Sequence, residues 1–210
     1  MIFWVSVVLN ILLMALIVIY LFRNKDKIRQ KFILAKGNPE LVMFGDSHTA
    51  NANWTSLLSG YSVISLGFSG MTSDQLKNLM MIKVLPLKPQ FCFIQGGGND
   101  INSRCYDKKI VVANIQEMID SLQSYSIQPV IQSLFSRYND RDYNKQVDSI
   151  NDLFRQIANK NNVPFLDINS SLVDKNGLKK ELTIDYIHLN NPGYKIWAGK
   201  IKDFLLSHQQ

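Results

Sequence analysis

The residues Leu41-Val42-Met43-Phe44-Gly45-Asp46-Ser47-His48 join an apolar run to a polar turn. Four consecutive apolar residues are typical of a short buried strand, and Gly45 ends the run. In an α/β fold this arrangement puts the hydroxyl of Ser47 at the carboxyl end of a strand, where such folds place their sites. Taken alone, however, Asp and Ser after a strand are ordinary turn residues. The rest of the chain has to decide between a structural and a chemical role for this turn.

Outward from this turn, strand-like and helix-like segments alternate along the chain. After the first strand at 41–44, further strands are predicted over 61–66, 91–95, 128–134 and 163–168. Helices are predicted over 54–58 (a short helix or turn), 73–85, 108–125, 141–161 and 191–206. This alternation predicts right-handed βαβ units and a parallel sheet that is covered on both faces. Residues 41–210 are therefore expected to form one three-layer α/β/α domain.

The chain begins with an apolar segment, Ile2–Phe22, in which no side chain is charged. A helix of that length is roughly 30 Å long, which matches the hydrocarbon core of a bilayer. Trp4 and Tyr20 lie near its two ends, where amphipathic rings prefer to be. The alternatives are a buried helix and a cleaved signal peptide, but no basic region precedes the run and no small-x-small site follows it. The sequence predicts a transmembrane anchor over residues 1–22.

Positive charge is concentrated directly after this segment. The net charge is +6, and residues 23–36 contain six basic side chains against Asp26, so the remainder of the chain carries only about +1. A nucleic-acid partner is therefore not indicated. Residues 23–40 form a basic connector, whose stretch 23–36 is expected to contact anionic lipid headgroups. The positive-inside rule places the domain in the cytoplasm, and the alternative is a periplasmic or other extracytoplasmic domain.

The composition and motifs indicate neither a metal nor a cofactor. A hydrophobic content of 46% favours a folded domain with a sizeable core. The two cysteines, Cys92 and Cys105, provide no disulfide framework and no zinc-binding pattern. Residues 96–98 are three glycines, but they lack the Gly-Lys-Ser/Thr ending of a phosphate-binding loop. We therefore expect chemistry that depends on the chain's own side chains.

Four polar clusters lie at the ends of predicted elements. They are Gly45-Asp46-Ser47-His48, Gly67-Phe68-Ser69-Gly70, Gly96-Gly97-Gly98-Asn99-Asp100 and Asp185-Tyr186-Ile187-His188. Each alone can be explained as a turn or a helix cap. Because parallel strands end at one edge of a sheet, the first three clusters are expected to converge there.

Together these clusters meet the needs of nucleophilic catalysis. A serine hydroxyl is a poor nucleophile until a base takes its proton, and His188 can be that base for Ser47. Asp185, three residues before the histidine, can orient the imidazole through a hydrogen bond. The N–H groups of Ser47 and Gly67 and the side-chain amide of Asn99 can form an oxyanion hole. Asp46 is expected to brace the turn through local backbone hydrogen bonds instead.

These clusters resemble the conserved blocks of the SGNH hydrolases, also called GDSL esterases or lipases. Gly45-Asp46-Ser47 resembles block I, Gly67 the block II glycine, Gly97-Gly98-Asn99-Asp100 block III, and Asp185-Tyr186-Ile187-His188 block V. The resemblance implies a flavodoxin-like fold, acyl-ester chemistry through an acyl-enzyme, and neither a metal nor a nucleotide cofactor. His48 departs from the Leu or Ile that is more frequent at its position, and a role at the mouth of the site is expected for it.

The predicted function is that of a membrane-anchored serine esterase. Its expected substrates are small acyl esters, of the acetyl type, on a carbohydrate or lipid-linked glycan. The loops 102–109 and 136–141 are expected to face the substrate, with contacts from His48, Arg104, Tyr106, Arg137 and Tyr138. Two alternatives stay open, an O-acyltransferase that uses the same residues and a catalytically idle, membrane-tethered binding module.

Overall fold

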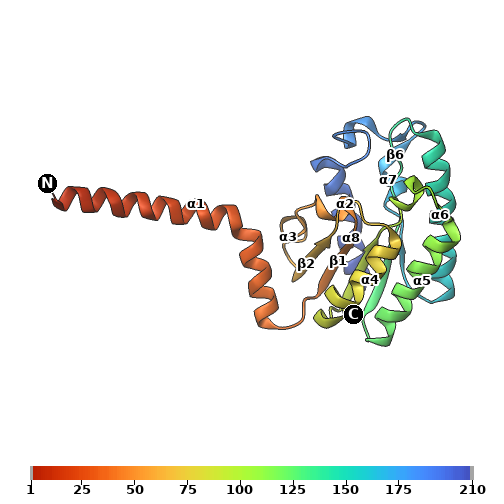
Figure 1. The fold of residues 1–210 in the computed structure, drawn as a ribbon, viewed down its shortest axis with the longest axis horizontal. Coiled ribbons are helices and arrows are strands. Elements are labelled where there is room, and N and C mark those ends of the chain that lie inside the picture. Colours follow the sequence, from red (N-terminus) through yellow and green to blue (C-terminus); the bar gives the residue numbers. More distant parts are fainter. Residues whose placement is uncertain (1, 209–210) are drawn as a thin grey trace. The chain divides into compact units, whose positions relative to one another are not determined.

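The computed structural model describes residues 2–208, and for residues 2–8, 26, 27, 34 and 36 it describes the helical backbone only. The chain divides into two compact units, Met1–Gly37 and Asn38–Gln210. The first contains the helix α1 (Ile2–Lys36), which continues to the end of the basic stretch 23–36 (Figure 1). Its described apolar side chains between Leu9 and Phe22 are exposed.

The structure does not support the predicted transmembrane helix over Ile2–Phe22. Among the residues with described side chains, no helix combines the length and the apolarity that crossing a bilayer requires. The apolar stretch that is described, residues 9–22, is shorter than the roughly 20 residues that span a hydrocarbon core. Residues 2–8 of the prediction lie outside the described side chains.

The second unit is built on a parallel sheet of five strands. They are β1 (Leu41–Gly45), β2 (Val63–Gly67), β3 (Phe91–Gln95), β4 (Gln128–Gln132) and β5 (Phe165–Leu166). Their order, β2-β1-β3-β4-β5, is the flavodoxin-like order and confirms the predicted α/β sheet. β5 is shorter than the predicted 163–168, and at its carboxyl end the N–H groups of Ile168 and Asn169 donate to the hydroxyl of Ser133 instead of continuing the ladder.

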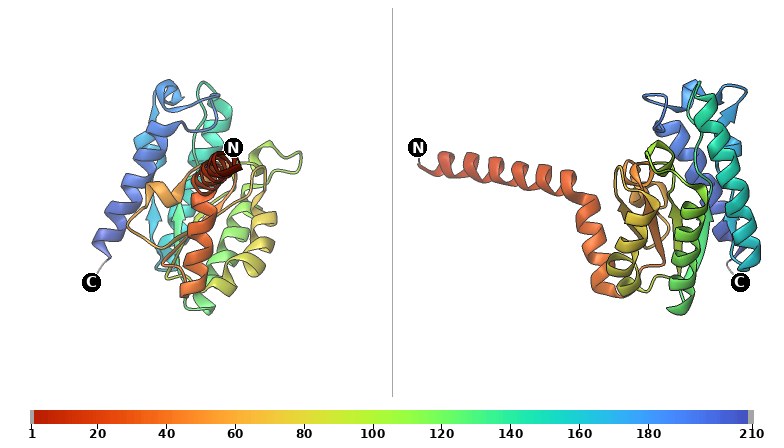
Figure 2. Two further views of the ribbon diagram at one scale, coloured as in Figure 1. Left: turned by 90° about the vertical axis from the view of Figure 1, so that its left-hand side faces the viewer. Right: turned by 45° about the vertical axis from the view of Figure 1, so that its right-hand side comes forward.

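Helices cover both faces of the sheet, as Figures 1 and 2 show. On one face, α5 (Lys108–Ser124) packs between α4 (Ser73–Lys83) and α6 (Arg141–Lys160). On the other, α8 (Asn191–Ser207) packs against α3 (Trp54–Leu57) and α7 (Asn169–Leu172). The short helix α2 (Ser47–Ala50) follows β1, and a small antiparallel hairpin pairs β6 (Val173–Asp174) with β7 (Gly177–Leu178). Neither α2 nor this hairpin was expected from the sequence.

Alternation along β1 supplies both halves of the core. Leu41 and Met43 belong to the cluster that contains Trp54 and Trp197, whose rings meet edge to face with centroids 4.8 Å apart. Their neighbours in the strand point to the opposite face, towards the α4, α5 and α6 layer, because successive strand residues alternate. The hydroxyl of Tyr194 on α8 donates to the carbonyl of His48 at 2.9 Å. This bond fixes α2, and with it Ser47, against the core.

Candidate active site

Ser47 is the first residue of α2, directly beyond the carboxyl end of the central strand β1. Asp46 caps this helix, since its Oδ1 accepts the N–H of His48 at 3.0 Å. This is the brace that the sequence predicted for Asp46. Gly67 allows α2 to approach β2 closely, because a Cβ at this position would lie 2.1 Å from the backbone nitrogen of Ala50. The packing of α2 against the end of β2 therefore requires a glycine at position 67.

Three side chains from the beginning and the end of the second unit form a continuous hydrogen-bonded relay. Ser47 Oγ lies 3.0 Å from His188 Nε2. On the other side of the ring, His188 Nδ1 lies 2.7 Å from Asp185 Oδ2. A proton on Nδ1 that is donated to the carboxylate leaves Nε2 free to accept the hydroxyl proton of Ser47. The predicted Ser47, His188 and Asp185 thus lie together, in the geometry that the activation of a serine requires.

Asp185 is held as a carboxylate by its neighbours. Burial alone would raise its pKa, but the hydrogen bonds from the His188 ring and from the N–H groups of His188 and Ile187 outweigh this effect and lower the pKa to about 2. The two backbone bonds, 2.7 Å from His188 and 3.0 Å from Ile187, converge on Oδ1. Oδ2 is thereby left for the imidazole. The same turn that presents the histidine also fixes the orientation of its carboxylate.

The three predicted oxyanion donors lie at one edge of the sheet. Gly45 pairs in register with Gly67 on β2 and with Gln95 on β3, so the residues that follow β1 and β3 emerge beside the end of β2. The N–H of Phe68, the residue that follows β2, donates to the carbonyl of Gly45, so the carboxyl ends of β1 and β2 stay paired.

Asn99, the third of these predicted donors, is fixed by a backbone contact. Its Nδ2 donates to the carbonyl of Met71 at 2.9 Å, which leaves the second proton of this amide for another acceptor. That this proton, together with the N–H groups of Ser47 and Gly67, stabilises an oxyanion stays a prediction.

Two buried titratable groups flank Ser47. Burial raises the pKa of Asp46 to about 7, although the N–H of His48 and the charge of His188 act in the opposite direction. Burial also lowers the pKa of His48 to about 3, assisted by the charges of His188 and Arg137. The His48 ring lies 5.3 Å from the ring of His188 and packs edge-on against Phe135. The ring of His48 is buried, so little of its surface is open to solvent. The role predicted for it at the mouth of the site stays a prediction.

The other predicted substrate contacts lie on two loops. Arg137 Nη1 contacts Asn102 Oδ1 at 3.2 Å, and so joins the loop after β4 to the loop after β3. Tyr138 stacks on Tyr186, within the turn that carries Asp185 and His188. Tyr106 donates to Gln146 on α6 at 3.2 Å. Arg104 is exposed. Tyr138 thus contacts the turn that carries two residues of the relay, while roles in substrate binding stay predictions for all of these residues.

The sequence did not predict two features of the site. Asp100 accepts both the N–H of Ser73, at 2.8 Å, and its hydroxyl, at 2.6 Å, and so anchors the start of α4 to the loop that carries Asn99. Tyr186 has a left-handed backbone, with φ of +71°, between Asp185 and His188. The position of Tyr186 inside the Asp-x-x-His motif was the one sequence signal that could have drawn attention to this residue. The sequence indicated no separate role for an aromatic side chain there.

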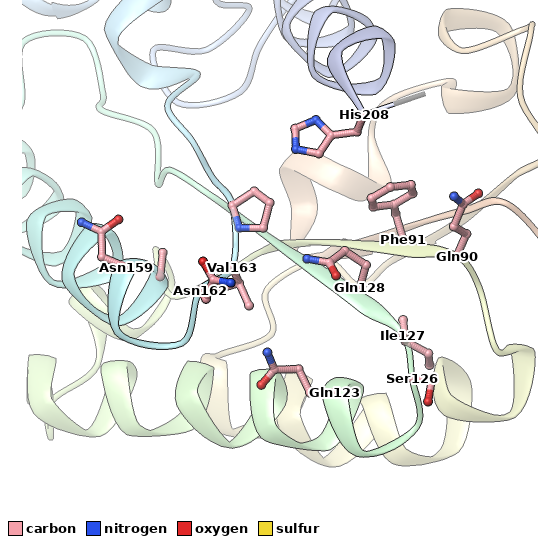
Figure 3. A pocket seen from close by; sticks show the side chains of 12 residues that line it. Gln90, Phe91, Gln123, Ser126, Ile127, Gln128, Asn159, Asn162, Val163 and His208 are labelled. Atoms are coloured by element: carbon pink, nitrogen blue, oxygen red, sulfur yellow. The ribbon is translucent and has the colours of Figure 1, made fainter. Parts of the chain in front are cut away.

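A broad groove of about 970 Å³ lies elsewhere on the domain, as Figure 3 shows. It is lined by Gln90, Gln128 and Pro164, which stand at the amino ends of β3, β4 and β5. Ser47 and Asn99 follow the carboxyl ends of strands, so the groove opens at the opposite edge of the sheet. The candidate active site is therefore the relay at the carboxyl edge, and the groove is separate from it.

Comparison with known proteins identifies the family of the chain. Residues 43–196 match the model of the GDSL-like lipase/acylhydrolase family, and the chain belongs to this family of ester-cleaving hydrolases. Among curated proteins, the chain is 22% identical over 185 residues to the uncharacterised lipoprotein YqeF of Bacillus subtilis, covering 69% of this chain and 76% of that protein.

Solved structures share the fold. A GDSL-like lipase from Bacteroides thetaiotaomicron superposes with a TM-score of 0.74 at 24% identity, covering 80% of this chain and 88% of that one. A variant of Axe2, an acetylxylan esterase from Geobacillus stearothermophilus, superposes with a TM-score of 0.68 at 19% identity, covering 80% and 94%.

Proposed function

We propose that this protein is a serine esterase that removes small acyl groups, of the acetyl type, from a carbohydrate or lipid-linked glycan. The observation that carries the proposal is the continuous relay from Ser47 Oγ through the His188 ring to Asp185, with contacts of 3.0 and 2.7 Å. Membership of an acylhydrolase family supports ester chemistry. The saccharide part of the proposal is supported by acetylxylan esterases among the structures that share the fold.

In the acylation step, Ser47 Oγ attacks the carbonyl carbon of the ester while His188 Nε2 takes the hydroxyl proton. The carboxylate of Asp185 stabilises the imidazolium that forms and keeps its ring oriented. The negative charge on the former carbonyl oxygen is met by the N–H groups of Ser47 and Gly67 and by the amide of Asn99. When the intermediate collapses, the bond to the alcohol oxygen breaks, and His188 returns the proton to the departing sugar hydroxyl.

Deacylation repeats these steps with water. His188 removes a proton from a water molecule, whose oxygen attacks the acyl carbon. The bond to Ser47 Oγ breaks, the serine regains its proton from His188, and the carboxylic acid leaves. The relay is the same in both halves, so each requires the neutral His188 that Asp185 orients.

The test is hydrolysis of p-nitrophenyl acetate by the purified full-length protein. Ser47→Ala is expected to lose turnover to the level of the buffer. Ser170→Ala, which removes an exposed serine hydroxyl on α7, is the matched control and is expected to keep it. Turnover that survives in Ser47→Ala at the wild-type rate would contradict the proposal.

A separate proposal is that α1 holds the protein at a membrane. Its support is the exposed apolar run over residues 9–22, which is followed by basic residues, and the likeness to a protein named as a lipoprotein. The wild-type protein is expected to sediment with membranes after a high-salt wash, and the double variant Leu16→Asp, Ile19→Asp to be released. A wild-type protein that stays in the supernatant contradicts the attachment and leaves the ester chemistry untouched.

A further inference from the structure

A pair of stacked tyrosines adjoins the relay. The rings of Tyr138 and Tyr186 have centroids 5.3 Å apart and planes inclined by 26°. The N–H of Tyr138 donates to the carbonyl of Tyr186 at 2.9 Å. Tyr186 belongs to the turn that presents Asp185 and His188, whereas Tyr138 belongs to the loop after β4. The pair therefore connects the base of the relay to a predicted substrate loop.

The stability of the fold does not account for an aromatic side chain at position 186. Its φ of +71° lies in the left-handed region, which a bulky side chain occupies at a cost of order 1 kcal/mol or more and which Asn or Gly would occupy more easily. Because Tyr186 is 53% exposed, the burial of its ring offsets only part of the cost of the left-handed backbone. The turn itself is closed by Asp185 Oδ1, which accepts the N–H groups of Ile187 and His188. An exposed aromatic ring on a strained backbone beside a reactive site points to a ligand contact as the function that the strain serves.

The loop under Tyr138 is held by several contacts within the protein. Both backbone polar groups of Arg137 are held by the side chain of Asn144, at 2.7 and 2.8 Å. Its guanidinium lies 3.6 Å from the ring centre of Tyr143. The aromatic pair is thus supported by fixed neighbours, so little conformational entropy is lost when a ligand stacks on it.

The charges around the pair favour a neutral ligand. Arg137, the adjacent cation, already contacts Asp140 Oδ2 at 3.5 Å and Asn102 Oδ1 at 3.2 Å. An anionic ligand would have to compete with this carboxylate. Tyrosine offers an apolar ring face and a hydroxyl that can donate and accept, which matches a pyranose with its C–H face and its hydroxyl rim.

We propose that Tyr186, supported by Tyr138, is the platform for the sugar ring whose acyl ester Ser47 attacks. The inference rests on the proposed esterase function and deepens it, since it assigns the leaving alcohol to a neutral saccharide. Tyr186 lies two residues before His188, so a pyranose stacked on its exposed face sits next to the relay. Binding energy from the sugar is thereby used to hold the ester at the serine.

The test compares two esters, p-nitrophenyl acetate and an acetylated xylo-oligosaccharide as the saccharide probe. Tyr186→Asn removes the ring but tolerates the left-handed backbone. It is expected to lower the ratio of kcat/KM for the saccharide to kcat/KM for p-nitrophenyl acetate by about tenfold, mainly through KM. Tyr186→Phe keeps the stacking face and is expected to keep the ratio within about threefold. Tyr125→Asn, which replaces a tyrosine that is 50% exposed after α5, is the matched control.

The outcomes separate this inference from the proposed function. Absence of Ser47-dependent hydrolysis of both esters in the wild-type protein contradicts the esterase itself. If the wild type hydrolyses p-nitrophenyl acetate but not the saccharide ester, the proposed sugar platform is contradicted. It is also contradicted if Tyr186→Asn leaves the ratio of the two kcat/KM values unchanged, or if Tyr186→Phe lowers this ratio as much as Tyr186→Asn does. Near-UV circular dichroism identifies any variant that is misfolded, and Tyr138→Phe and Tyr138→Leu then give a second measurement on the partner ring.

Discussion

Replacing Asp46 by Asn should make the protein more resistant to unfolding at neutral and alkaline pH. Asp46 is 2% exposed, and its Oδ1 accepts the N–H of His48. An asparagine oxygen can accept the same hydrogen bond, so the cap is kept. What the substitution removes is a carboxyl group whose charged form is poorly solvated.

The magnitude follows from the shift in the pKa. Burial raises the pKa of Asp46 from 3.8 to about 7. Between these two values the native protein retains the proton and the unfolded chain has lost it, so stability falls as the pH rises through this window. At 1.36 kcal/mol per pH unit, the cost above pH 7 is roughly 4 kcal/mol, and it disappears below pH 3.8. The stability gained by Asp46→Asn should therefore be small at pH 4 and grow by about that amount by pH 8.

Urea unfolding of the full-length protein at a series of pH values measures this difference. Near-UV circular dichroism is a suitable signal, because Trp54 and Trp197 pack edge to face in the core. A free-energy difference between variant and wild type that stays constant from pH 4 to pH 8 would refute the reasoning, as would a difference that shrinks. Asp46→Ala, which also removes the cap, separates the charge from the hydrogen bond.

Three further predictions follow from the same contacts. His48→Gln should remove a loss of stability at acid pH, because burial lowers the pKa of His48 from 6.5 to about 3 and the unfolded chain alone binds the proton between these values. Urea midpoints that decline equally in the variant and the wild type from pH 6.5 to pH 4 would contradict this. Asn99→Ala should lower kcat by roughly 10²–10³ through loss of one oxyanion donor, and kcat within twofold of wild type in a folded variant would exclude that role. Gly67→Ala should lower stability by about 1–3 kcal/mol and reduce kcat, because its methyl group would lie 2.1 Å from the backbone nitrogen of Ala50. Gly60→Ala, whose methyl group would have nothing within 4 Å, is the matched control, and equal thermal midpoints and kcat in the two variants would count against the close approach.

The sequence predicted the elements whose signals are strong and local. Apolar runs bounded by glycine identified the central strands, and helical stripes identified the long helices of both layers. The relay of Ser47, Asp185 and His188 was also predictable, because parallel strands end at one edge and a carboxylate three residues before a histidine can reach its ring.

The features that were missed depend on contacts that are distant in the sequence or on unusual backbone geometry. At the carboxyl end of the short β5, the hydroxyl of Ser133 takes the N–H groups of Ile168 and Asn169. The role of Asp100 depends on Ser73, which lies in a different crossover. The stacking of Tyr186 requires a left-handed residue, and neither hydropathy nor periodicity indicates one.

The predicted transmembrane helix had the strongest hydropathy signal in the chain. Its support among the described side chains is limited to the exposed run at residues 9–22.

The most direct test of the central claim is the labelling of Ser47 by a fluorophosphonate, followed by mass spectrometry of the intact protein and of its peptides. Because the reagent requires a serine that a base has activated, we expect one adduct on the peptide containing Ser47 in the wild-type protein, and labelling slower by roughly 10³-fold or more in His188→Ala. Labelling of a different serine, or equal rates in wild type and His188→Ala, would contradict the relay.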